Sequence, residues 1–319
     1  MLYNTEGYIF NSYGKIDYLK YVIACITTIR RYDKTRKIAL YCSKNQKDFI
    51  ITNNLKEWFD VLELLDEKYQ SITGFKHNLH LFCAFDRNLF IDSDIIWLKN
   101  PDPMWTYLSA FDYAVTGLDV ADSFFGAPKS LKVLRDILLQ RRTRTLKNFG
   151  LTQLSRVQSG VIYVKNSNLA EVINAKANYF LVNMNRTHFQ SRLLEKGRTE
   201  ESCEWSLGMA LSALGISVIP WFQAENSIQL DFIEDYTKYD TDFKNVECLY
   251  YFDSFVYSFR GLKQRAIRKF LHYIFSIIPG KNDYAWLKPY CVHFGWYHQK
   301  EPFIQFAQKI WVELLSKHN

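Results

Sequence analysis

Two aspartates, Asp92 and Asp94, stand one residue apart in RNLFIDSDIIWLKN (87–100), with apolar residues on both sides. Residues i and i+2 of an extended segment face the same side, so both carboxylates can point at one cation. A buried carboxylate without a partner is very costly, and a positive group must therefore lie nearby. Carboxylate oxygens suit Mg²⁺ or Mn²⁺. The spacing predicts a divalent-metal site at this pair.

Other interpretations of the aspartate pair remain open. The two carboxylates could cap the following helix or bind backbone amides in a turn. A calcium-binding EF-hand loop is excluded, because Ile96 and Trp97 occupy positions that require an oxygen ligand and a glycine. A phosphohydrolase of the haloacid-dehalogenase type would use Asp92 as its nucleophile, and the segment FIEDYTKYD (232–240) would have to supply its late acidic cluster.

The elements around the aspartates alternate between strand and helix in the first third of the chain. Buried strand patterns cover 7–13, 37–43, 61–66 and 87–94, and helical patterns cover 16–32, 47–59 and 77–85. This alternation is typical of a mostly parallel α/β sheet with helices on both faces. Ligands of such sheets bind beyond the carboxyl ends of the strands, where Asp92 and Asp94 stand.

The remainder of the chain continues the pattern and then changes. We expect strands at 113–117, 123–128 and 159–166, and helices at 131–146 and 204–216, the last ended by Gly215. Beyond residue 236 the sequence is rich in aromatic residues and includes a long basic helix. The pattern predicts a catalytic core at 1–240 and a helical C-terminal elaboration at 241–319, packed together as one structural domain.

Composition narrows the classes of partner and compartment. The 319 residues are 48% apolar, which indicates a globular chain, and the net charge of +7 favours anionic partners. No motif for nucleic-acid binding accompanies this charge, so nucleic acid is not expected as a partner. The six cysteines form no CxxC pair, and the N-terminus has no secretory pattern. These features predict a protein that is cytoplasmic or attached peripherally to a membrane.

Four segments together resemble a known enzyme family. FDRNLFIDSDIIWLKNPDPMW (85–105) resembles the DxD segment that ends the fourth strand of GT-A-fold glycosyltransferases. QSGVIYVKN (158–166) resembles their NSGVMLIN strand, and CEWSLGMALSALG (203–215) resembles the helix with a DE-x-x-L start, with Cys203 in place of Asp. VHFGWYHQKEPF (292–303) resembles the terminal HF-x-G-x-x-KPW of retaining galactosyl- and glucosyltransferases of the glycogenin type.

The resemblance implies a Rossmann-like GT-A fold and a set of metal and phosphate ligands. Asp94 would bind Mn²⁺ or Mg²⁺ directly, and Asp92 would contact both the metal and the ribose. His293 would be the third protein ligand, and Lys300 would contact a donor phosphate. The metal and the lysine would compensate the charge of a nucleotide diphosphate.

The resemblance also implies residues that contact the rest of the donor and the acceptor. Gln158 and Ser159 would line the donor sugar, and Glu204 would lie near the acceptor, which makes Glu204 and Gln158 the catalytic candidates. The turn from Tyr8 to Asn11 would hold the uracil and ribose. Lys76 or Arg87 would add positive charge near the nucleotide.

The predicted function is metal-dependent transfer of a hexose from a UDP-sugar to a glycan or glycolipid acceptor. The phosphohydrolase remains an alternative, and so does a non-catalytic protein that binds nucleotide sugars or lipid surfaces. The basic segment RGLKQRAIRKFLHYIFSII (260–278) has two interpretations of its own. Its apolar stripe could pack on the core with a solvated basic face, or it could lie on an anionic membrane near a lipid-linked acceptor.

Overall fold

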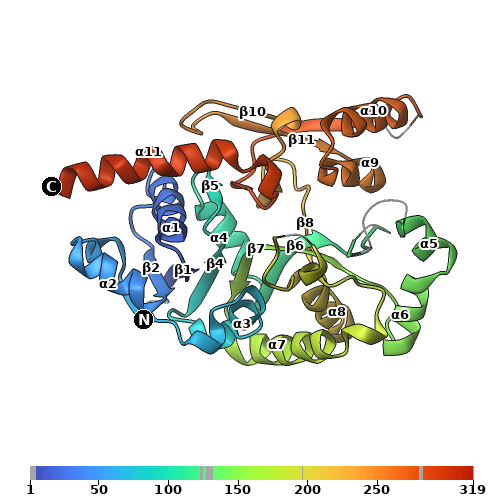
Figure 1. Cartoon of the computed structure of the whole chain (residues 1–319), viewed down its shortest axis with the longest axis horizontal. Helices are drawn as coiled ribbons and strands as arrows, with labels where there is room; N and C mark the ends of the chain where they lie inside the picture. The colour runs from blue at the N-terminus through green and yellow to red at the C-terminus, as the bar shows by residue number, and fades with distance from the viewer. Residues whose placement is uncertain (1–4, 123–124, 127–131, 196, 280–282, 319) are drawn as a thin grey trace. The chain divides into compact units, whose positions relative to one another are not determined.

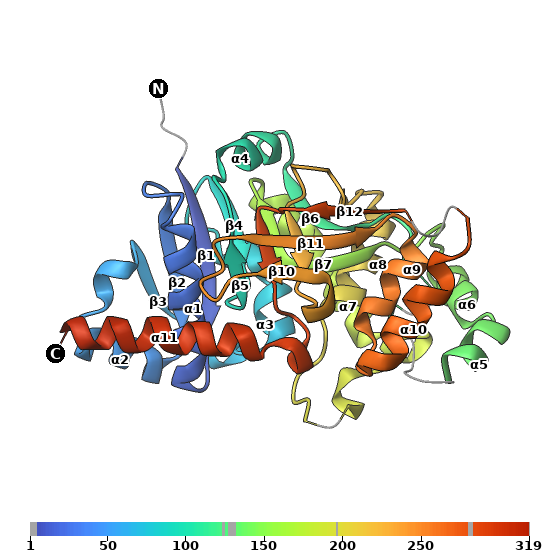
Figure 2. The same ribbon diagram turned by 90° about the horizontal axis from the view of Figure 1, so that it is seen from above.

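The computed structural model describes residues 5–122, 125–126, 132–195, 197–279 and 283–318 (Figures 1 and 2). The chain forms two compact units whose segments alternate along the sequence. The first unit comprises Met1–Tyr18, Thr35–Ile91 and Tyr107–Pro220, and the second comprises Leu19–Lys34, Asp92–Thr106 and Trp221–Asn319. The division at residue 240 remains a prediction.

A seven-stranded sheet organises the first unit, in the order β3-β2-β1-β4-β7-β6-β8 (Figure 1). Its strands are β1 (Glu6–Ser12), β2 (Lys37–Cys42), β3 (Val61–Leu64), β4 (Arg87–Ile91), β6 (Tyr113–Leu118), β7 (Arg156–Val164) and β8 (Ile219–Pro220). Only β7 is antiparallel to its neighbours β4 and β6; the other pairs are parallel. The predicted mostly parallel α/β sheet is therefore confirmed.

Apolar runs explain why these strands form the interior. Ile9, Leu40, Leu89 and Val164 are completely buried, as expected of central strands whose two faces are covered by helices. The helices of this unit are α2 (Lys44–Thr52), α3 (Ile72–Lys76), α5 (Lys132–Leu138), α6 (Arg141–Phe149), α7 (Ser167–Val182) and α8 (Glu204–Leu214). Helix α8 packs on β7 and on α7, and it ends at Gly215 with a left-handed φ of 68°, as predicted.

Several predicted helices differ from the structure. The helix predicted at 77–85 is only a 3₁₀ turn at Leu79–Phe82, and the one at 47–59 is α2 followed by a 3₁₀ turn at Lys56–Trp58. The basic helix predicted at 131–146 is divided into α5 and α6, because Gln140 adopts a left-handed φ of 48°. Most of the strand predicted at 123–128 lies outside the described residues.

The second unit contains two small sheets. One has the order β5-β13-β9 and the other β10-β11-β12. Their strands are β5 (Ile95–Trp97), β9 (Gln229–Asp231), β10 (Thr237–Tyr239), β11 (Val246–Tyr251), β12 (Tyr284–Leu287) and β13 (Cys291–His293). The helices of the C-terminal segment are α9 (Ser254–Ser258), α10 (Arg265–Ser276) and α11 (Glu301–His318) (Figure 2). The basic helix predicted in this segment corresponds to α10.

Aromatic side chains hold the second unit together. The rings of Phe232 and Phe294 stack with centroids 4.4 Å apart, and the ring of Phe294 also lies 5.1 Å from that of Phe303 on α11.

Two further helices, α1 (Ile16–Ile29) and α4 (Asp102–Leu108), each have residues assigned to both units. Within the described part of the chain, no helix combines the length and the hydrophobicity required to span a bilayer.

Candidate functional site

Strand pairing in the second unit brings Asp94 close to His293. Asp94 directly precedes β5, and β5 runs antiparallel to β13 with Ile95 opposite His293. The ladder continues one step further, because the backbone N–H of Phe294 donates to the carbonyl of Asp94 at 2.9 Å. The pairing of two three-residue strands thus places two polar side chains from distant parts of the sequence side by side.

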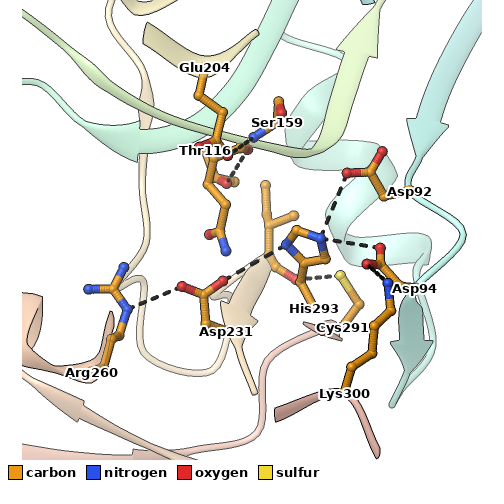
Figure 3. A network of polar contacts seen from close by, with 12 residues as sticks. Asp92, Asp94, Thr116, Ser159, Glu204, Asp231, Arg260, Cys291, His293 and Lys300 are labelled. Atoms are coloured by element: carbon orange, nitrogen blue, oxygen red, sulfur yellow. Dashed lines mark hydrogen bonds and ion pairs between the residues drawn. The ribbon is translucent and has the colours of Figure 1, made fainter. Parts of the chain in front are cut away.

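Asp92, Asp94 and His293 form a compact group of possible metal ligands (Figure 3). One ligand atom from each residue lies within 4.8 Å of the other two. The Nε2 atom of His293 is 3.3 Å from Asp94 Oδ1 and 3.7 Å from Asp92 Oδ2. The histidine is buried, with 7% of its surface exposed, whereas the two aspartates are partly accessible. The three side chains predicted as metal ligands therefore converge.

Lys300 supplies positive charge to the same group. It follows β13 through a 3₁₀ turn at Tyr297–Gln299, and its Nζ donates to Asp94 Oδ2 at 2.7 Å. Burial would raise the pKa of Asp94, but Lys300 and His293 hold it well below its ordinary range. Burial would also lower the pKa of Lys300, and the charge of Asp94 instead raises it.

His293 is held as a cation in the absence of a metal. Burial alone would lower the pKa of its imidazole, but the surrounding carboxylates, first of all that of Asp94, raise it to about 9. Lys300 and His293 are therefore the positive groups that the half-buried aspartate pair required. A metal ion that binds through Nε2 would have to displace a proton from this ring.

Asp231 lies on the Nδ1 side of His293, and Arg260 contacts Asp231. The sequence analysis predicted neither as a residue of the site. Strand β9 is parallel to β13 and places Asp231 opposite His293. Its Oδ1 is 3.9 Å from His293 Nδ1, on the side of the ring that faces away from Asp92 and Asp94 (Figure 3). The guanidinium of Arg260 contacts Asp231 Oδ2 at 3.2 Å. The alternation of polar and apolar residues in SIQLDF (227–232), which is typical of a strand, was the available signal.

Arg260 is itself fixed by aromatic rings. Its guanidinium carbon lies 3.9 Å from the ring centroid of Tyr257 and 4.9 Å from that of Trp221, and only 3% of its surface is exposed. The Tyr257 carbonyl accepts a further hydrogen bond from it at 3.0 Å. Such a desolvated arginine needs a carboxylate partner, and Asp231 is that partner.

The donor set fits a small divalent cation. Two carboxylates and one imidazole are oxygen and nitrogen ligands of the kind that Mn²⁺ accepts and Mg²⁺ tolerates. Ligand atoms about 2.1 Å from a shared ion are separated by roughly 3 to 4 Å, and the distances from His293 to the two aspartates lie in this range. Three protein ligands also leave coordination positions for other oxygens.

Several residues predicted to contact the donor meet in the first unit. Lys76 donates from Nζ to the carbonyl of Ser159 at 2.9 Å and lies 3.2 Å from its Oγ. The backbone N–H of Ser159 donates to Glu204 Oε1 at 3.4 Å (Figure 3). Cys203, at the N-terminus of α8, contacts Ser159 Oγ through its sulfur at 3.3 Å. A lysine, a hydroxyl and a carboxylate thus form one polar cluster.

The other predicted residues have different environments. The carbonyl of Gln158 accepts from Thr116 Oγ1 at 3.4 Å where β6 and β7 change register. Tyr8 is completely buried within β1, and Asn11 on the same strand is half-buried. Arg87 forms an ion pair with Glu6. The roles of these residues toward a donor remain predictions.

Comparison with known proteins gives distant structural likenesses. No protein-family model matches the chain, and no curated protein matches its sequence. The structure is similar to the galactosyltransferase LgtC solved with donor and acceptor sugar analogues, at 10% identity and a TM-score of 0.48, over 97% of this chain and 95% of LgtC. It is also similar to the glycosyltransferase GlyE of Streptococcus pneumoniae, at 15% identity and a TM-score of 0.48.

A third similar structure is the bifunctional glycosyltransferase WbbM, at 13% identity and a TM-score of 0.48. The chain spans 63% of the length of GlyE and 52% of the length of WbbM. The structural neighbours are thus glycosyltransferases, the class that the sequence motifs resemble. At these identities and TM-scores, an assignment of function has to come from the residues of the chain itself.

Proposed function

We propose that the protein is a metal-dependent glycosyltransferase that moves a hexose from a UDP-sugar to a glycan or a lipid-linked acceptor. The observation that supports this proposal is the convergence of Asp92, Asp94 and His293, with Lys300 beside them. Two carboxylates, a histidine and a lysine are an arrangement suited to a cation and the phosphates that it carries. Mn²⁺ or Mg²⁺, when bound, would stabilise the negative charge of the departing diphosphate.

The residues of the chain have distinct proposed tasks. Asp92, Asp94 and His293 hold the cation, and this requires loss of the imidazole proton of His293. Lys300 exchanges its contact with Asp94 Oδ2 for one with a donor phosphate, since both partners are anionic oxygens. Asp92 also contacts the ribose.

For the first unit we keep the roles that the sequence resemblance implies. Ser159 and Gln158 contact the donor sugar, and Glu204 lies near the acceptor. Lys76 adds positive charge at Ser159, where the structure gives it two contacts. The segment from Tyr8 to Asn11 holds the base.

The contacts of the acidic segment 232–240, which a phosphohydrolase would need for catalysis, argue against this alternative. Asp235 is bound by the guanidinium of Arg268 and by Arg265. Asp240 accepts hydrogen bonds from the backbone N–H groups of Lys244 and Asn245, so it stabilises a turn. Two acids of the segment 232–240 are thus engaged in local structure.

Release of UDP in the absence of acceptor tests the proposal. We expect slow hydrolysis of UDP-galactose or UDP-glucose that depends on Mn²⁺, stops with EDTA and is absent in Asp94→Asn. Asp66→Asn, at a carboxylate that is 66% exposed, is the matched control and should retain the activity. Hydrolysis of a simple phosphate ester would identify the phosphohydrolase, and donor binding without turnover would identify a binding protein.

A further inference from the structure

Helix α10 packs on the protein through both polar and aromatic side chains. Arg268 and His272, one turn apart, are 3% and 4% exposed. The guanidinium of Arg268 binds the carboxylate of Asp235 and donates to the carbonyl of Leu262 at 2.8 Å. The Nδ1 atom of His272 lies 2.9 Å from the hydroxyl of Tyr236, and its ring stacks on Tyr251. The inner face of the helix therefore combines these polar contacts with the ring of Phe275, which lies 5.2 Å from the rings of Phe255 and Phe259.

The opposite face of α10 and the residues that follow it expose large apolar side chains. The exposed fractions are 46% for Ile267, 61% for Phe270, 66% for Tyr273, 40% for Ile274, 62% for Ile277 and 43% for Ile278. These residues recur at spacings of three and four, so they share one side of the helix. Leu262, Leu271 and Phe275 of the predicted stripe are half-buried, so the stripe packs on the protein along one edge and is exposed along the other.

Positive charge accompanies this apolar face. The segment 260–278 contains five Lys and Arg residues and no Asp or Glu. Arg260 and Arg268 are buried, whereas the other three, Lys263, Arg265 and Lys269, are exposed. Arg265, Lys269 and Tyr273 are four residues apart and therefore line one edge of the helix. The side chains of Arg265 and Lys269 are 62% and 54% exposed. Both side chains approach the buried carboxylate of Asp235, but Arg268 binds it as well. One negative charge is thus shared by three positive charges. The surface presented by α10 is therefore both apolar and basic.

We propose that α10 docks the protein on an anionic lipid surface, with Phe270, Ile274 and Ile277 inserted among the lipids. A contiguous exposed apolar patch marks a site of interaction. A helix with an apolar face and a basic edge is suited to lie in the plane of a membrane interface, with its cations at the headgroups. A second copy of the chain is a poorer partner, because two copies of this face would bring like charges together. The proposal does not depend on the transfer activity.

Sedimentation of the full-length protein with lipid vesicles tests this docking. We expect at least tenfold stronger binding to vesicles that contain phosphatidylserine than to vesicles of phosphatidylcholine alone, and weakening by added salt. The double variant Phe270→Ser, Ile277→Ser should lose at least tenfold in binding, because it removes two inserted side chains. Lys263→Gln should lose about fivefold, as expected for one cation near an anionic surface.

A matched control separates docking from a general loss of apolar surface. Ile51 on α2 is 55% exposed, similar to Ile277, so Ile51→Ser should bind vesicles like the wild type. Equal binding by the wild type and the double variant, or binding to neither kind of vesicle, would overturn the proposal. So would a dimer in sedimentation velocity that the double variant dissociates. Vesicle binding by a protein that releases no UDP would leave the docking intact and reject only the transferase.

Discussion

The ammonium group of Lys300 lies 2.7 Å from Oδ2 of Asp94, although the two residues are 206 positions apart in the sequence. This ion pair and the protonated ring of His293 together neutralise the two aspartates when no metal is bound. The same carboxylate is a candidate metal ligand, so a metal would join or replace an existing electrostatic arrangement. The residues around the site therefore matter for metal binding and for the stability of the metal-free protein.

The substitution Asp94→Asn separates these two contributions. Loss of the carboxylate should abolish detectable Mn²⁺ binding and UDP release. It should also lower the stability of the metal-free protein by about 1–3 kcal/mol, because Lys300 and His293 lose their shared partner in a mostly buried site. Calorimetric titration with Mn²⁺ and urea unfolding measure the two effects. Asp66→Asn is the control, and unchanged Mn²⁺ affinity in Asp94→Asn would show that the aspartate pair is structural.

Metal affinity should depend steeply on pH because of His293. The pKa of this imidazole is about 9 in the metal-free protein, so binding at pH 7 must release its proton. Apparent Mn²⁺ affinity should rise about tenfold per pH unit between pH 7 and 9 and level off above. Calorimetry in buffers of different ionisation enthalpy measures the proton released.

The stability of the metal-free protein should depend on pH in the opposite direction. Because the pKa of His293 is raised above its ordinary value of 6.5, the protonated imidazole stabilises the fold fully below pH 6.5, and this stabilisation is lost as the pH rises through 9. The melting temperature of the metal-free protein should therefore fall over this interval, and that of His293→Gln should fall less. An affinity for Mn²⁺ that is constant from pH 7 to 9 would contradict the assignment of His293 as a ligand.

The sequence predicted the residues whose role depends on local pattern. The apolar runs predicted most strands of the central sheet. The DxD spacing and the resemblance of the HFG segment predicted Asp92, Asp94 and His293 as metal ligands; the three side chains converge, and their role as ligands remains a prediction. Asp231 could not be found in this way, because its position depends on parallel pairing of β9 with β13. That pairing joins two strands of only three residues each, Gln-Leu-Asp and Cys-Val-His, which carry little information about their partners.

The hydrophobic periodicity of α10 also could not predict which face of the helix packs on the protein. A helical stripe shows which residues share a face but not whether that face meets protein or solvent. Here Arg268 is buried because Asp235 compensates its charge. Of the apolar stripe, Ile267, Phe270 and Ile274 are exposed, whereas the ring of Phe275 packs against those of Phe255 and Phe259. The break between α5 and α6 has a similar cause, since nothing in the residue type of Gln140 requires its left-handed φ of 48°.

Gly295 should be required for the position of the histidine ring. A Cβ atom at this residue would lie 2.8 Å from Cε1 of His293 and 3.3 Å from both ring nitrogens. Gly295→Ala should therefore displace the imidazole and weaken Mn²⁺ binding by about tenfold, the lower range for a disturbed ligand orientation. Gly150→Ala is the control. Because Gly150 has a φ of 63°, this substitution should lower the free energy of unfolding by about 1 kcal/mol, but it should leave the affinity for Mn²⁺ unchanged. Equal Mn²⁺ affinity in Gly295→Ala and wild type would show that the ring has room to move.

Asp231 should act on the metal through His293. Its carboxylate faces Nδ1 of the ring at 3.9 Å, beyond hydrogen-bond length, and a small shift would let it accept the Nδ1 proton while Nε2 faces the aspartates. Asp231→Asn should weaken Mn²⁺ binding by about 10- to 100-fold. It should also lower the pKa of His293, because one of the surrounding negative charges is lost.

Asp235→Asn provides the matched control for this last prediction. Asp235 is also a buried aspartate paired with a buried arginine in the same unit, but its partners are on α10. Both substitutions should destabilise the protein, since each leaves an arginine without its carboxylate. Only Asp231→Asn should change the Mn²⁺ affinity and the number of protons released on binding, both measured by calorimetry. If the two variants lose Mn²⁺ affinity equally, the effect comes from general destabilisation, and Asp231 has no specific role in orienting His293.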